Sequence, residues 1–117
     1  MKGKPFAADQ NGRMSRVPLA KPQLAAIADA CRQNHVARMH VFGSIVRPDY
    51  RPGESDIDLL VEFEALEPSA LVEAYFDLER QLASITGQPV DLVMADAVRN
   101  PYVRADIDAS KQLIYEV

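Results

Sequence analysis

The sequence has little of what extracellular, zinc-binding or membrane proteins need. It contains one cysteine, Cys31, and two histidines in 117 residues. A single cysteine excludes a disulfide framework, and without a Cys/His cluster we expect no zinc site. No apolar run approaches the ~20 residues of a membrane-spanning helix, and the first 17 residues lack the apolar segment of a secretion signal. These absences predict a protein of the reducing cytoplasm that does not associate with membranes.

The sequence also lacks the excess of basic residues that a general nucleic-acid binder carries. Lys and Arg number 13 against 17 Asp and Glu, for a formal net charge of −4. A nucleic-acid-binding surface needs clustered positive charge, so we expect no direct contact with nucleic acid. A nucleotide substrate is still compatible with this charge, because a bound metal ion can supply the positive charge.

The length of the chain predicts one domain. Residues 1–17 are polar and aperiodic, so they are expected to form a flexible N-terminal arm before a domain of residues 18–117. Apolar periodicity and turn residues then predict the elements of that domain. The expected helices are 18–34, 67–86 and 100–110, and the expected strands are 37–42, 56–63, 89–94 and 113–115. This order indicates an α/β (α+β) fold, a small mixed β-sheet with helices packed on one face and acidic residues on the other.

Two carboxylates stand out on the second expected strand. Alternate residues of a strand share a face, so Asp56 and Asp58 lie about 6.5–7 Å apart along the backbone. Side chains so placed can converge on divalent cations, which prefer oxygen ligands. Adjacent like charges on an otherwise apolar strand are unfavourable, which favours a functional reason for the pair. An isolated Asp-x-Asp is more often a solvated strand face.

The segment that follows the first expected strand strengthens the functional interpretation. Gly43 allows a ligand to approach the backbone closely, and consecutive amides of such a turn can bind an anion. Ser44 can donate its hydroxyl to a phosphate oxygen. Arg47 lies three residues on and could reach the same phosphates.

These two motifs resemble a known family signature. Gly43-Ser44-Ile45-Val46-Arg47, followed by Ser55-Asp56-Ile57-Asp58, is similar to the signature of minimal nucleotidyltransferases, the MNT branch of the DNA polymerase β-like superfamily. The resemblance covers most of residues 19–117. It implies that Gly43 and Ser44 hold a nucleoside triphosphate. It further implies that Asp56 and Asp58 bind metal, and that a third carboxylate on a later strand, matched by Asp91, binds metal and serves as base. The chain departs from the family pattern at Val46 and Pro48, where the family commonly has Ala and Gly, and its loop to Asp56 is longer.

The resemblance also implies an activity and a partner. The reaction is attack of a hydroxyl on the α-phosphorus of a nucleoside triphosphate, with ATP as expected donor and two Mg²⁺ ions as cofactors. Similar stand-alone proteins are typically prokaryotic antitoxins paired with a HEPN-domain toxin, whose tyrosine they modify with AMP. Two alternatives stay open: a binding module that neutralises its partner by contact alone, and a transferase acting on a small hydroxylated molecule.

Other candidate residues have simpler explanations. Cys31 fits the apolar stripe of the first helix and is expected in the core. His35 and His40 are expected to be surface or partly buried polar residues. Glu62 is expected to be solvated, and Tyr102 and Arg104 are expected to pack rather than bind.

Overall fold

The structure, a computed structural model, describes residues 18–46 and 56–117. The expected N-terminal arm and Arg47 lie outside these residues. The described elements follow the predicted order, and they are α1 (Lys21–Gln33), β1 (Val36–Phe42), the 3-10 turn η3 (Gly43–Val46), β2 (Ile57–Phe63), α2 (Pro68–Thr86), β3 (Val90–Met94), the 3-10 turn η4 (Ala95–Ala97), α3 (Pro101–Ser110) and β4 (Gln112–Glu116). No helix among the described residues is both long and apolar enough to cross a membrane.

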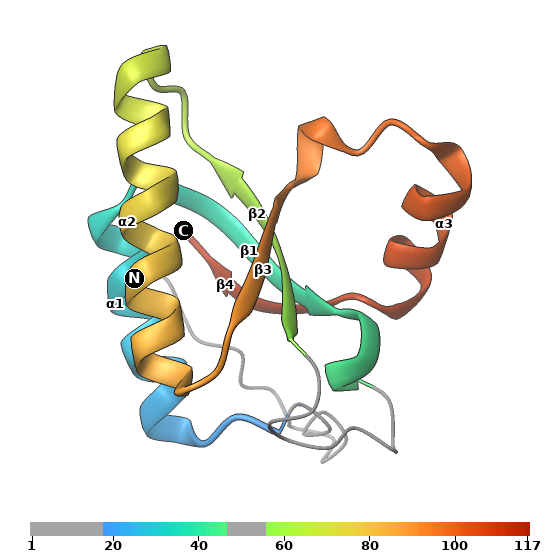
Figure 1. The fold of residues 1–117 in the computed structure, drawn as a ribbon, viewed down its shortest axis with the longest axis horizontal. Coiled ribbons are helices and arrows are strands. Elements are labelled where there is room, and N and C mark those ends of the chain that lie inside the picture. Colours follow the sequence, from blue (N-terminus) through green and yellow to red (C-terminus); the bar gives the residue numbers. More distant parts are fainter. Residues whose placement is uncertain (1–17, 47–55) are drawn as a thin grey trace.

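The four strands form one mixed sheet in the order β3-β2-β1-β4. β1 pairs antiparallel with both β2 and β4, whereas β2 and β3 run parallel. A parallel pair needs a long connection between its strands, and α2 provides it (Figure 1). The sheet confirms the predicted fold class.

The hydrophobic core lies between this sheet and the helices α1 and α2. Alternate residues of β2 enter it, since Ile57, Leu59 and Val61 are all buried. The two helices contribute Ile27, Cys31, Leu78 and Leu82, each at most 1% exposed. α2 ends where predicted, because Gly87 adopts the left-handed conformation that favours glycine at a helix C-terminus (φ 70°).

The third helix departs from the expectation that all helices cover one face. Figure 1 shows α3 on the opposite side of the sheet from α1 and α2. The Asn100 side chain accepts hydrogen bonds from the first backbone amides of α3 and so caps the helix. Arg104 then fastens α3 to the turn after β3 by donating to the carbonyls of Ala95 and Val98 (3.3 and 3.0 Å). Within α3 only Ile107 is buried, so helical periodicity alone did not reveal which face it would cover.

Candidate functional site

Two of the predicted site carboxylates lie side by side on adjacent strands. Asp58 of β2 is in register with Asp91 of β3. Neighbouring strands are about 4.8 Å apart, and residues in register project from the same face. The following pair, Leu59 and Leu92, is buried in the core. Asp58 and Asp91 therefore project from the other face, which was expected to carry acidic residues.

Gly43 lies directly against Asp58. Phe42, the last residue of β1, is in register with Asp58, and Gly43 follows it with φ 76°. A Cβ added at Gly43 would stand 3.2 Å from the Asp58 Cγ and closer still to its Oδ2. Only a glycine backbone can come this near to the carboxylate. The end of β1 and the acidic strand pair thus form one constellation, from residues that are 15 and 33 positions apart in the sequence.

Asp56, the third predicted metal ligand, is not paired across strands with another carboxylate as Asp58 and Asp91 are. Asp56 is exposed and immediately precedes β2, two positions from Asp58 and so on the same face by strand alternation. Within residues 18–46 and 56–117, no three carboxylate, imidazole or thiol side chains are gathered closely enough to hold a metal ion as they stand. Of the nucleotide-binding candidates, Gly43 and Ser44 form the start of η3, and Arg47 lies outside the described residues.

Tyr75 supports the edge strand at this site, which sequence reasoning did not predict. Its hydroxyl donates to the carbonyl of Leu92, the residue after Asp91, at 2.5 Å. Burial, followed by the charges of Glu79 and Asp91, raises the pKa of Tyr75. No sequence signal indicated the partner of its hydroxyl.

His40 lies on the same face of the sheet, one step along from Asp58. It is in register with Leu60 on β2 and is 9% exposed, and its Nδ1 has no hydrogen-bond partner among the described residues. Burial and then the charge of Lys111 lower the pKa of His40. His35, by contrast, is exposed in a left-handed turn (φ 60°). His40 is therefore a buried imidazole whose charged form is disfavoured by its surroundings.

The remaining candidates behave in different ways. Cys31 is in the core as predicted, where burial raises the pKa of its thiol to about 12 and makes it unreactive. Glu62, expected to be solvated, is partly exposed and forms an ion pair with Arg38 at 2.7 Å. Tyr102, expected to pack, is 84% exposed.

Comparison with known proteins finds relatives that carry nucleotidyltransferase or adenylyltransferase names. Residues 24–114 match the model of a nucleotidyltransferase domain family. Two relatives from Methanocaldococcus jannaschii carry the names "Putative protein adenylyltransferase MJ0128" and "Putative protein adenylyltransferase MJ1379". They are 40% and 38% identical over 80 residues, a stretch that covers 68% of this chain and 76% of each relative.

Solved structures share the fold. A "putative minimal nucleotidyltransferase" superposes with a TM-score of 0.65 and 27% identity, covering 79% of this chain and 89% of its own. A tri-AMPylated Shewanella oneidensis HEPN toxin in complex with its MNT antitoxin gives a TM-score of 0.57 at 21% identity, covering 83% and 72%. A toxin–antitoxin structure with AMP-PNP gives 0.60 at 22% identity, covering 80% and 73%.

Proposed function

Because this chain belongs to the nucleotidyltransferase domain family, we propose that it transfers AMP from ATP to a tyrosine hydroxyl of a partner HEPN toxin and so acts as an antitoxin. The observation that carries the proposal is the constellation of Gly43, Asp58 and Asp91 on one face of the sheet. The named relatives support protein adenylylation as the reaction class. The shared fold of the toxin–antitoxin complexes supports the kind of partner.

The donor set fits a magnesium ion. Asp58 and Asp91 provide oxygen ligands from adjacent strands, and hard cations prefer such ligands. The two like charges repel each other when no cation is present. A residue with a side chain at position 43 would fill the space beside Asp58. We propose Asp56, Asp58 and Asp91 as the metal ligands of two Mg²⁺ ions. Bound Mg²⁺ would neutralise charge on the triphosphate and on the leaving pyrophosphate.

The chain's own residues would orient the reactants. The Gly43 backbone and Ser44 would hold the triphosphate, with Arg47 reaching the same phosphates. The acceptor oxygen would form a bond to the α-phosphorus. The bond between the α-phosphorus and the oxygen that bridges it to the β-phosphate would break, and pyrophosphate would leave. Asp91 would accept the hydroxyl proton. Catalysis would depend mainly on positioning and electrostatics.

The proposal is tested with labelled ATP and Mg²⁺, using as acceptor a HEPN-domain protein if one is encoded by the neighbouring gene. Asp58→Asn and Asp91→Asn should each reduce labelling by about 100-fold or more. Asp29→Asn is the matched control, because Asp29 is exposed on α1, on the other side of the sheet. Labelling that survives both site substitutions would refute the assignment. If a folded Asp56→Asn/Asp58→Asn variant still neutralises the toxin, neutralisation occurs by contact alone.

A further inference from the structure

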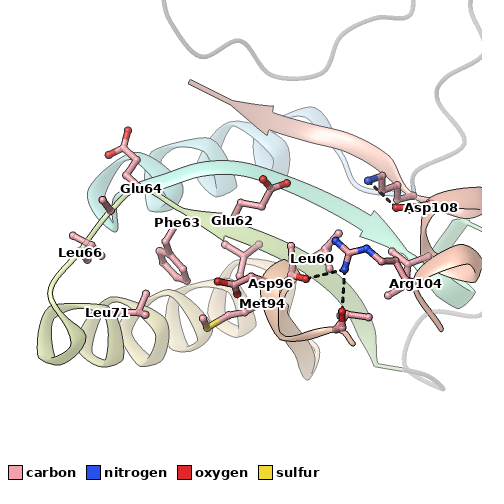
Figure 2. A pocket seen from close by; sticks show the side chains of 16 residues that line it. Leu60, Glu62, Phe63, Glu64, Leu66, Leu71, Met94, Asp96, Arg104 and Asp108 are labelled. Atoms are coloured by element: carbon pink, nitrogen blue, oxygen red, sulfur yellow. Dashed lines mark hydrogen bonds and ion pairs between the residues drawn. The ribbon is translucent and has the colours of Figure 1, made fainter. Parts of the chain in front are cut away.

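We propose that a hollow beside the candidate site binds a Lys- or Arg-containing segment of the protein acceptor, close in sequence to the modified hydroxyl. The inference rests on the proposed function, because it concerns how a protein acceptor would be recognised. The hollow has a volume of about 470 Å³ and is bounded by the end of β2, by η4 and by α3 (Figure 2). We refer to it as the acidic hollow.

The acidic hollow begins next to the site carboxylates. Leu60 and Glu62 line it, and they follow Asp58 on β2 at alternate positions. Alternate residues of a strand share a face, so the two side chains project from the sheet on the same side as Asp58. They lie about 7 Å and 13 Å along the strand from it. A segment lying in the hollow would therefore extend away from the carboxylates along β2.

Only some of the charged side chains that line the hollow have hydrogen-bond or ion-pair partners. Four carboxylates and two cationic side chains line it. Both cations already have partners, because Arg104 donates to two backbone carbonyls and Lys111 pairs with Asp108 at 3.0 Å (Figure 2). The side-chain carboxylates of Glu64 and Asp96, by contrast, form no hydrogen bond or ion pair with any described residue. With four carboxylates against two cationic side chains, the hollow carries a net negative charge, which favours a cationic occupant and disfavours a triphosphate.

The walls of the hollow are apolar. Phe63, Leu71, Met94 and Ile107 contribute to the lining. Lysine and arginine side chains match this combination, because their aliphatic stems cover apolar surface while their charged ends reach the rim. An extended chain advances about 3.3–3.6 Å per residue. A basic residue that lies beside Leu60 or Glu62 and extends its side chain toward Glu64 or Asp96 would thus be about two to four residues from the modified position.

The binding step can be tested without ATP, which separates this inference from the transfer reaction. Three fluorescein-labelled 12-residue peptides would carry one tyrosine and, three residues away, Lys, Gln or Glu. Fluorescence anisotropy should show the Lys peptide binding the intact chain roughly 3- to 30-fold more tightly than the Glu peptide. The double variant Glu64→Lys/Asp96→Lys should remove this preference. The control Asp29→Lys/Asp106→Lys makes the same charge change at exposed positions of α1 and α3 outside the hollow, and it should retain the preference.

A kinetic measurement completes the test. In the double variant the KM for the partner protein should rise while kcat is unchanged, because the site carboxylates are intact. Equal binding of the three peptides, or binding of none, would overturn the inference, whereas AMP transfer to the partner would still uphold the proposed function. Displacement of the Lys peptide by adenosine would also overturn it, since the hollow would then hold the nucleoside. Peptide preference without any AMP transfer would instead refute the proposed function.

Discussion

Replacement of Gly43 by alanine tests the contact on which the candidate site depends. The residue has φ 76°, and the space where a Cβ would project is occupied by the carboxylate of Asp58. The substitution therefore has two separate effects. It places an L-residue in the left-handed region, and it forces the carboxylate away from its position in register with Asp91.

The two effects have different magnitudes and different readouts. The left-handed conformation costs a non-glycine residue about 1–2 kcal/mol. For a chain of this length, 1 kcal/mol corresponds to about 4 °C in Tm, so the conformational cost alone is about 4–8 °C. Displacement of Asp58 by about 1 Å would lower the Tm further and would reduce nucleotidyl transfer by about 100-fold.

Gly87→Ala is the matched control for this experiment. Gly87 has nearly the same backbone conformation, φ 70°, but an added Cβ meets no atom within 4 Å. Thermal unfolding should show a smaller Tm loss for Gly87→Ala than for Gly43→Ala, and transfer activity should fall only in the latter. In an Asp58→Gly background the extra Tm loss at position 43 should disappear. Full activity of Gly43→Ala would refute the idea that the carboxylate needs this glycine.

Two further predictions concern neighbouring groups. Tyr75→Phe removes the donor to the Leu92 carbonyl and should lower the free energy of unfolding by about 0.5–1.5 kcal/mol, measured by urea denaturation; unchanged stability would show that this hydrogen bond contributes nothing. His40 has a lowered pKa in the folded chain, so the unfolded state binds its proton first as the pH falls through about 6.5. Stability should therefore decrease between pH 7.5 and pH 5.5, more in the native chain than in His40→Leu; equal losses in both proteins would contradict the assignment.

Features with a strong local signal could be predicted from the sequence. The alternation of apolar and polar residues placed Ile57 and Leu59 in the core and Asp58 on the opposite face, as the structure confirms. Apolar periodicity and turn residues predicted a helix over 67–86, and α2 ends at Thr86, just before Gly87. Periodicity and capping depend on neighbours in the chain, so one sequence is enough to reveal them.

Features that depend on distant residues could not be predicted in the same way. The position of α3 depends on Arg104 meeting two carbonyls of the turn after β3. The ion pair of Glu62 depends on the register of β2 against Arg38 in β1. Tyr102 is an aromatic residue with apolar neighbours, which favoured packing, but it lies on an exposed turn of a helix with little buried surface. Side-chain contacts between different helices and strands can be identified only once the arrangement of the sheet is known.

The parallel pairing of β2 with β3 has a consequence for how the protein is made. β1 and β2 are near neighbours in the chain, whereas the whole of α2 lies between Asp58 and Asp91. Closure of such a connection is entropically costly and comes late when contacts are distant in sequence. A growing chain that ends before residue 90 holds Gly43 and Asp58 but has no partner carboxylate. The proposed binding of a metal–nucleotide complex should therefore become possible only on completion of folding.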